Sequence, residues 1–404
     1  MSTSWLYDGF GIRGYQYVKT EYLDGGVVFH VSQSLERCRC SACGSTEVAS
    51  RGHVERDFRS LPIGSKPTTV VLPIPRVECL ACGVIRQVAV DFAAPRRRHT
   101  RSFARYVLQL SQLMTIQDVA QHLGVGWDLV KEIRKEDLQR RFRKPKLKRL
   151  QRIAIDEISV GKGPRYLTIV LDLDSGAVVH VGEGKGGESL LNFWKRLRSS
   201  GAEIKAVATD MSPAYIDAVT THLPDATLVF DRFQVMKLFN DKLSDLRREL
   251  YREATNRQHK DVLKGTRWLL LKRPENLDSK KNEPARLAEA LRLNQPLATA
   301  YYLRDQLGEV WEQDDQDTAL DLLLDWVAQA EASGIRVLKT FAKTIRLHAW
   351  GILAWYDHSL STGPLEGTNN KIKTMKRQAY GFRDQEFFKL KIYALHESKY
   401  ALVG

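Results

Sequence analysis

From residue 150 onward the spacing of the apolar residues first predicts a part that forms a sheet and then a part that is helical. β-branched apolar runs come first, separated by the turn-forming sequences Gly-Lys-Gly-Pro and Asp-Ser-Gly, and they predict a three-strand meander. Helix-like and strand-like runs then alternate, which implies parallel neighbours in a mixed α/β sheet. The predicted strands cover residues 152–160, 165–173, 177–184, 204–210 and 226–233, and the predicted helices cover 189–201 and 213–224.

From residue 233 to about residue 356 the apolar positions recur at helical spacing, most clearly in 296–312 and 316–330. This interval is too long for a loop, so we expect an all-helical insertion inside the α/β domain. Trp311 and Trp326 lie in these predicted helices. An exposed indole can stack on an unpaired base, but the apolar-periodic positions of both favour packing in a core.

Residues 115–133 show the pattern of a helix-turn-helix. Ala120 is the small residue at which two helices would cross, and Gly124 follows in the turn. The second helix, from about Trp127 to Leu138, would enter a DNA groove. Helical hairpins that bind no DNA share parts of this pattern. The predicted packing positions are Val119, Leu123, Val125, Val130 and Ile133.

Composition indicates the class of partner. The 404 residues suffice for two or three domains, and 43% apolar residues are ordinary for a globular protein. Lys and Arg number 62 against 48 Asp and Glu, a formal charge of +14. Such a charge favours a nucleic-acid partner, although it fits a basic enzyme surface equally well. No run of 18 apolar residues and no signal-peptide pattern is present, so we predict a cytoplasmic, nucleoid-associated protein without a membrane partner.

Two basic segments flank the helix-turn-helix. Residues 95–105 hold five arginines and residues 140–152 hold eight basic residues, and neither segment contains an acid. A solvated linker is the alternative for the first segment. We interpret the second as too polar to pack and as a linker that follows DNA phosphates. The candidate DNA contacts in this half of the chain are Arg96, Arg97, Arg98, Arg101, Trp127, Lys131, Arg134, Arg140, Arg141, Arg143 and Lys144.

Four of the five cysteines form two short knuckles, Cys40-x-x-Cys43 and Cys79-x-x-Cys82, each followed by glycine. Two such pairs can direct four thiolates at one tetrahedral Zn²⁺, and a redox motif would need only one pair. The knuckles therefore predict a zinc site that substitutes for a core in a small N-terminal domain. Cys38 could compete with Cys40 as a ligand.

The segment 361–382 is strongly basic but contains a single acid, Glu366. Pro364 suits the first turn of a helix. On that helix Glu366 would share a face with Asn370, Lys373 and Arg377, and Lys371, Lys373 and Arg377 are candidate DNA contacts. The opposite, apolar face would hold Leu365, Ile372, Met375 and Ala379.

A carboxylate that faces a phosphate backbone is repelled by it unless a divalent metal lies between them. Asp156 lies in the first predicted strand and Asp210 ends the fourth, so both should line one crevice at the strand ends. Together with Glu366 they would form the all-oxygen site that Mg²⁺ or Mn²⁺ prefers. The alternative is that Glu366 pairs with Asn370 or Lys373 on the surface.

The order of these motifs resembles the DDE transposases of bacterial insertion sequences, in particular the ISL3 group. The resemblance spans nearly the whole chain and rests on the knuckles, the helix-turn-helix, IAIDEISVGKG, VATDMSPAY, VFDRFQV and GPLEGTNNKIKTMKRQAYGFRDQEFFKLKI. It implies that Asp156, Asp210 and Glu366 are the catalytic triad of an RNase H-like fold, with Lys373 as the basic residue after the acid. Gln234 stands where the family usually has histidine, and Asp231 is a supporting candidate only.

The resemblance implies a multidomain transposase that binds the terminal inverted repeats of an insertion sequence. It would use two Mg²⁺ ions to cut DNA and join it to a target, and it would act as a homodimer on double-stranded DNA. A DNA-binding regulator without catalysis and a structure-selective nuclease of the same fold remain alternatives. The expected segments are a zinc-binding domain (1–94), a helix-turn-helix with a basic linker (95–150), an α/β RNase H-like catalytic domain (151–232 and 359–404) and its all-α insertion (233–358).

Overall fold

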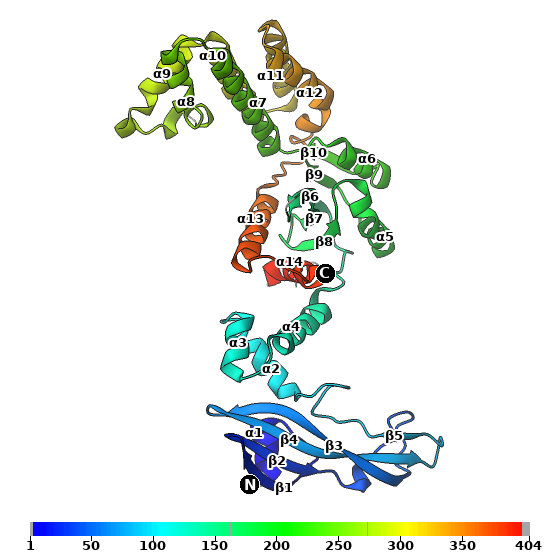
Figure 1. The fold of residues 1–404 in the computed structure, drawn as a ribbon. Helices are drawn as coiled ribbons and strands as arrows, with labels where there is room; N and C mark the ends of the chain where they lie inside the picture. Colours follow the sequence, from blue (N-terminus) through cyan, green and yellow to red (C-terminus); the bar gives the residue numbers. More distant parts are fainter. Residues whose placement is uncertain (1–2, 162, 273, 398–404) are drawn as a thin grey trace. The chain divides into compact units, whose positions relative to one another are not determined.

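The computed structural model describes residues 3–161, 163–272 and 274–397 (Figure 1). The chain forms two compact units, Met1–Arg141 and Phe142–Gly404. None of the described helices combines the length and the apolar character needed to span a bilayer.

The N-terminal unit begins with a helix and a five-stranded sheet. The sheet order is β1-β2-β4-β3, with β5 paired to β4, and β3 and β4 form a long antiparallel hairpin (Figure 1). The unit has its own hydrophobic core, centred on side chains such as Phe29, Phe58 and Val70. The expectation that zinc replaces a core here is therefore wrong, because alternate residues of the long strands already bury an apolar face. The elements are α1 (Thr3–Phe10), β1 (Gln16–Leu23), β2 (Gly26–Ser32), β3 (Val48–Ile63), β4 (Lys66–Cys79) and β5 (Ile85–Gln87), with a 3₁₀ turn at Leu35–Arg37.

Three helices complete this unit: α2 (Arg101–Leu110), α3 (Ile116–Leu123) and α4 (Trp127–Phe142). A reciprocal capping box between Thr115 and Asp118 starts α3, and Gly124 ends it in the left-handed conformation. The predicted helix-turn-helix is confirmed, and its second helix is longer than expected. Its core contains Phe103, Val107, Val119, Ala120, Leu123, Val130 and Ile133, with Val125 partly buried beside them.

The C-terminal unit is built on a sheet of order β10-β9-β6-β7-β8. The β6–β7 and β7–β8 pairs are antiparallel, and the β6–β9 and β9–β10 pairs are parallel. This is the predicted meander followed by parallel neighbours, and it confirms the RNase H-like α/β class. The elements are β6 (Arg152–Ser159), β7 (Tyr166–Asp172), β8 (Val178–Glu183), α5 (Leu191–Ser200), β9 (Ala206–Thr209), α6 (Pro213–His222) and β10 (Thr227–Phe230), with a 3₁₀ turn at Gly187–Leu190.

Helices cover both faces of this sheet. On one face, Ile153 and Ile155 pack with residues of α5 and α6, among them Trp194 and Tyr215. On the other face, Ala154 and Ile158 pack with α13 (Gly363–Gln378) and α14 (Gln385–Tyr393). Helix α13 lies against β6 and α14 against β8 (Figure 1). Successive residues of β6 therefore project to different helical layers.

An all-helical insertion separates β10 from α13, as predicted. Its two tryptophans are buried, with Trp311 4% and Trp326 0% exposed, and the Trp326 indole N–H donates to the Leu303 carbonyl at 2.6 Å. Core packing is thus confirmed for both, and neither ring is available to stack on DNA. The helices are α7 (Arg232–Glu253), α8 (Arg257–Gly265), α9 (Glu283–Leu293), α10 (Gln295–Glu309), α11 (Gln316–Ala332) and α12 (Arg336–Leu353), with 3₁₀ turns at Leu269–Leu271, Pro274–Asn276, Ser279–Lys281 and Val310–Glu312.

The basic segment 140–152 does pack, contrary to the sequence-based interpretation. Leu147 and Leu150 are 4% and 1% exposed and join the core of the C-terminal unit. The Arg196 guanidinium also donates to the Pro145 carbonyl at 2.6 Å. Basic side chains between the leucines stay exposed, so a high net charge did not prevent the apolar positions from being buried.

Candidate functional site

The β3–β4 hairpin brings the two cysteine knuckles together. Val48, the first residue of β3, pairs with Cys79, the last residue of β4, so the chain before β3 meets the chain after β4. Each knuckle closes with the same backbone bond at 2.9 Å, from the Gly44 N–H to the Cys40 carbonyl and from the Gly83 N–H to the Cys79 carbonyl. Both glycines have positive φ angles, of 79° and 69°, which is the turn the sequence predicted.

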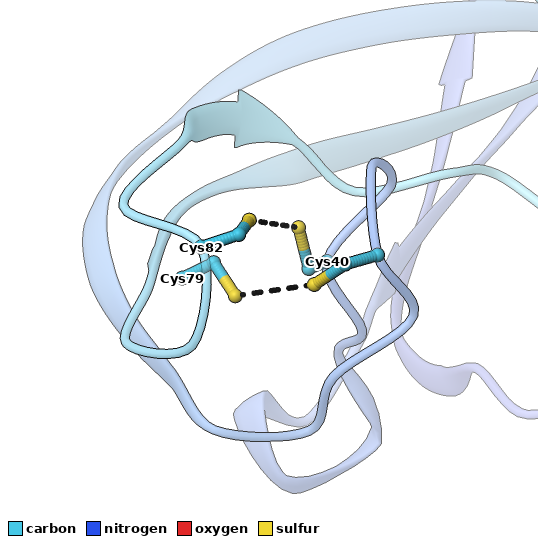
Figure 2. Close-up of side chains that lie close together, drawn as sticks. Cys40, Cys79 and Cys82 are labelled. Carbon is cyan, nitrogen blue, oxygen red and sulfur yellow. Dashed lines mark hydrogen bonds between the residues drawn. The ribbon is translucent and has the colours of Figure 1, made fainter.

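The four thiols have the spacing of a zinc site. Their sulfur atoms all lie within 4.8 Å of one another, and Sγ–Sγ distances are 3.7 Å for Cys40 and Cys82 and 3.5 Å for Cys43 and Cys79 (Figure 2). Tetrahedral Zn²⁺ with Zn–S bonds of about 2.3 Å requires sulfurs about 3.8 Å apart. Backbone N–H groups of Cys43 and Ala42 lower the pKa of the Cys40 thiol to about 6. In the same cluster the Val84 N–H lowers the pKa of Cys82, but hydrogen bonds with the Cys43 and Cys79 thiols raise it further, so metal binding must displace the remaining protons. The residues present therefore fit Zn²⁺.

Cys38 lies apart from this cluster. Its side chain is 0% exposed within the hydrophobic core of the N-terminal unit, and its thiol contacts the Ser34 carbonyl at 3.5 Å. Burial raises the pKa of this thiol. Cys38 is thus not placed to compete with Cys40 as a ligand.

The sheet places the two predicted catalytic aspartates at one edge. Strands β6 and β9 are parallel, and Ala154 is opposite Ala208. Asp156 and Asp210 each lie two residues further along, so both carboxylates are near the C-terminal ends of neighbouring strands. Polar residues at such strand ends line the crevice in which open α/β sheets bind their ligands.

Burial perturbs both carboxyls. It raises the pKa of Asp156 to about 6, and the nearby Glu157 and Asp210 carboxylates act in the same direction. Burial also raises the pKa of Asp210, with a further contribution from Glu157. Lys237 of α7 opposes the shift at both positions. The surroundings of these two partly buried acids disfavour the ionised carboxylates, and a bound cation would stabilise them.

Helix α13 joins this site through an amide. Asn369 is 5% exposed, and its Nδ2 donates to Asp156 Oδ2 at 2.8 Å, while the Glu157 N–H donates to Asp156 Oδ1 at 2.8 Å. Glu366 is half-buried on the same helix, three residues before Asn369, and residues at this spacing are neighbours on a helix surface. The structure therefore brings all three predicted acids to the same region of the C-terminal unit.

The ligand atoms of the three acids do not, however, all lie within 4.8 Å of one another. In the described ranges, the four cysteines are the one group of three or more His, Cys, Asp or Glu side chains whose ligand atoms all lie within 4.8 Å. The carboxylate donors fit Mg²⁺ or Mn²⁺ in chemistry. Asn369 Oδ1, on the amide that bonds to Asp156, is buried and has no hydrogen-bond partner among the described residues, and the same is true of Glu157 Oε2.

Sequence reasoning missed several residues of this site. Asn369 follows Leu365 by four residues and precedes Ile372 by three, which places it on the packed face of the helix. A polar residue on that face is the sequence signal that could have identified it. Ala379, predicted on that face, is instead the exposed C-terminal cap. Asp231, 2% exposed, accepts a hydrogen bond from the Thr362 hydroxyl at 2.6 Å and so ties β10 to the start of α13. Asp231 was already a supporting candidate from the sequence, whereas only the folded chain shows the contribution of Lys237.

Most of the candidate DNA contacts are exposed. Arg97 differs, because it pairs with Glu132 at 2.8 Å and also with Glu136, both on α4. Arg134 is partly buried, and burial lowers its pKa. The Lys131 ammonium lies 5.6 Å from the centre of the Trp127 ring. The exposed candidates are Arg96, Arg98, Arg101, Trp127, Arg140, Arg141, Arg143, Lys144, Lys371, Lys373 and Arg377.

Known proteins resemble the chain over most of its length. Residues 36–82 match the "zinc-finger of transposase IS204/IS1001/IS1096/IS1165", and residues 88–135 match the "Helix-turn-helix domain of transposase family ISL3". The transposase for insertion sequence element IS1001 of Bordetella parapertussis is 36% identical over 358 residues, which are 88% of each chain. The transposase for insertion sequence element IS1557 of Mycobacterium tuberculosis is 31% identical over 377 residues, covering 86% of this chain and 83% of that one.

Among solved structures, the Drosophila P element transposase strand transfer complex aligns with a TM-score of 0.35 and 12% identity, over 62% of this chain and 78% of that one. The ISL3 family of DDE transposases, described as "Transposase", matches residues 153–392, which is more than half of the 404 residues and includes β6, β9 and α13. The chain therefore belongs to the ISL3 family of DDE transposases.

Proposed function

We propose that the chain is the transposase of an insertion sequence. It binds the terminal inverted repeats, cuts the DNA at the ends of the element and joins these ends to a target. The observation that supports this most is the bond from Asn369 to Asp156, because it fastens the helix that carries Glu366 to the strand end beside Asp210. A regulator without catalysis would gain nothing from this convergence of carboxylates.

Asp156, Asp210 and Glu366 would hold the divalent metal ions. Mg²⁺ or Mn²⁺, when bound, supplies Lewis acidity at phosphoryl oxygens and lowers the pKa of bound water. Asn369 donates a hydrogen bond to one oxygen of Asp156 and so fixes the orientation of this carboxylate. The exposed Lys371, Lys373 and Arg377 on α13 neutralise phosphates of the DNA that reaches these acids.

DNA recognition would fall to the N-terminal unit. Helix α4 presents Trp127 at its start, with Lys131 one turn later, and such a second helix reads base edges in the major groove. Exposed arginines before α2 and after α4 set the position of the protein on the DNA phosphates.

Two element ends require two active sites, so we propose a homodimer. In this scheme residues 1–94 bind zinc, 95–150 read DNA, 151–232 and 359–404 catalyse, and 233–358 form the insertion.

The test uses the full chain, Mg²⁺ and DNA that carries the two inverted repeats which should flank the gene. We expect cleavage at the repeat ends and products joined to a second DNA. Binding without cleavage would support the regulator, and equal cleavage of DNA without the repeats would support the nuclease. A genome in which no inverted repeats flank the gene would contradict the proposal before any assay.

A further inference from the structure

One aromatic side chain in the C-terminal unit buries none of its surface. Tyr380, which follows α13, is 101% exposed, whereas Tyr215 and Tyr301 are 1% and 4% exposed. A tyrosine ring is a large apolar surface that folding normally covers. Because Tyr380 covers nothing in the described fold, packing gives no reason for an aromatic residue at this position.

The backbone conformation at Tyr380 also disfavours a residue with a side chain. Tyr380 has a φ of 51°, in the left-handed region. Its N–H bonds to the Arg377 carbonyl and the Gly381 N–H bonds to the Lys376 carbonyl, both at 3.0 Å. With Ala379 as the C-terminal cap, these are the two bonds of a Schellman motif, and Tyr380 holds the position that glycine usually occupies. A residue with a side chain is disfavoured there, so Tyr380 costs stability without a compensating contact.

Between Lys373 and Glu386 the chain on either side of Tyr380 carries more basic than acidic residues, the acids being Asp384 and Glu386. The exposed bases Lys373 and Arg377 precede it, and Arg383 follows it. Across the described ranges, no acid is within ion-pair distance of any of these three bases. Unpaired bases around an exposed aromatic ring are the pattern of a surface that binds single-stranded nucleic acid, where bases stack on the ring and cations contact the backbone.

The position along α13 relates the ring to the candidate active site. Tyr380 comes 14 residues after Glu366. Helix α13 ends at Gln378, 12 residues after Glu366, which is about 18 Å at about 1.5 Å per residue, so Tyr380 lies roughly 20 Å along the helix direction from Glu366. Twenty ångströms is about six base steps of DNA at about 3.4 Å per step along one strand. A strand that follows α13 from Glu366 would therefore reach Tyr380 a few nucleotides from the scissile phosphate.

We propose that Tyr380 stacks on an unpaired base of the element-end DNA, several nucleotides from the cut, and holds that strand apart from its complement. The inference rests on the proposed function, because it needs DNA at the carboxylate site. Stacking on a π face is tolerant of sequence, so Tyr380 would recognise the unpaired state of the base and not its identity.

The test compares Tyr380→Gly, Tyr380→Phe and a control, Tyr302→Ala, in the full chain without Mg²⁺. Tyr302 is another exposed tyrosine, 64% exposed, in α10 of the insertion. The probe is end DNA with a short unpaired segment that contains 2-aminopurine, and the readouts are its dissociation constant and its fluorescence. We expect Tyr380→Gly to bind about ten- to a hundredfold more weakly and to lose the quenching of 2-aminopurine. Tyr380→Phe and Tyr302→Ala should match the wild type.

The same variant separates function from structure. Because glycine fits the left-handed position, Tyr380→Gly should melt at the wild-type temperature or above it, and a clearly lower melting temperature would indicate a structural role and overturn the proposal. Unchanged affinity and quenching would also overturn it. Conversion of a wild-type dimer to a monomer by Tyr380→Gly would assign the ring to a subunit contact instead. If the wild type still cuts element ends in any of these cases, the proposed function stands without the inference.

Discussion

The cysteine cluster and the carboxylate cluster are both sets of metal-binding side chains, but they are assembled in different ways. The four thiols come from two knuckles at one end of a single hairpin, and their sulfur atoms already lie at zinc-binding distances. The three acids come from within β6, from the end of β9 and from a helix that follows them by more than 150 residues, and they are not grouped within 4.8 Å in the described chain.

This difference is the one expected between a structural zinc site and the catalytic site that we propose for the acids. Closed structural zinc sites use all four ligands and contribute folding energy. A catalytic site must leave coordination positions for water and substrate, and its acids are held by hydrogen bonds and not by a preformed cage. Asp156 is an example, because Asn369 and the Glu157 N–H fix its two oxygens. We therefore expect changes at the cysteines to affect stability most, and changes at the acids to affect chemistry most.

The largest effect should follow Cys43→Ser. The variant loses a zinc ligand, and structural zinc sites contribute about 10 kcal/mol or more to folding. Because the N-terminal unit has its own core, we expect the two knuckles to lose their order first and the unit to melt at a much lower temperature. Elemental analysis should give one zinc per wild-type chain and less than one in the variant.

Cys38→Ala is the matched control for this experiment. It removes a buried thiol of the same unit that lies outside the cluster. We expect it to keep one zinc per chain and to cost only the packing of a small side chain. Full zinc occupancy in Cys43→Ser together with loss of zinc in Cys38→Ala would reverse the assignment of ligands.

An effect of the opposite sign should follow Asp156→Asn. Burial raises the pKa of Asp156 to about 6, compared with an ordinary value of about 3.9, and this difference corresponds to on the order of 3 kcal/mol. The neutral amide avoids this cost and keeps the shape. Both hydrogen bonds persist if the Asn369 amide turns so that its Oδ1, which has no partner in the described chain, accepts from the new NH2 group. We therefore expect Asp156→Asn to be more stable than the wild type at pH 7 without Mg²⁺, as measured by chemical denaturation.

The stability difference between the wild type and Asp156→Asn should depend on pH. Below about pH 4 the carboxyl of Asp156 is protonated in both the folded and the unfolded chain, so wild type and variant should be equally stable. Between about pH 4 and pH 6 the unfolded chain releases the proton while the folded chain keeps it, and the wild type loses stability relative to the variant. A stability difference that shrinks as the pH rises would contradict the account.

A smaller effect should follow Asn369→Ala. The change removes one hydrogen bond to a carboxylate, which is worth about 1.5–3 kcal/mol, and it frees Asp156 to rotate. We expect a modest loss of stability and a higher Mn²⁺ dissociation constant in calorimetric titration. Thr374→Ala, at an exposed position of the same helix, should change neither quantity; equal results for the two variants would remove Asn369 from the site.

The sequence predicted what depends on local patterns. Cysteine spacing, the Ala120 and Gly124 signals of the helix-turn-helix and the strand periods of the sheet all describe residues close together in the chain, and the structure confirms each of them. Asp156 and Asp210 could be placed at one sheet edge because parallel strands align their ends.

What the sequence did not predict depends on contacts between distant residues. The hydrogen bond from Asn369 to Asp156 spans 213 positions, and the contribution of Lys237 comes from a helix of the insertion. Leu147 and Leu150 are buried, but the basic residues around them in the sequence led to the prediction of an exposed linker. The N-terminal core was underestimated because its strands are longer than a small zinc domain suggested.

The central claim is that Glu366 completes the metal site of a transposase, and Glu366→Gln tests it most directly. This substitution removes the charge and keeps the size of a half-buried side chain. Zinc content, melting temperature and binding to element ends should match the wild type, while Mg²⁺-dependent cleavage of those ends should fall below detection. Cleavage at the wild-type rate would contradict the claim and would make Glu366 a surface residue of α13.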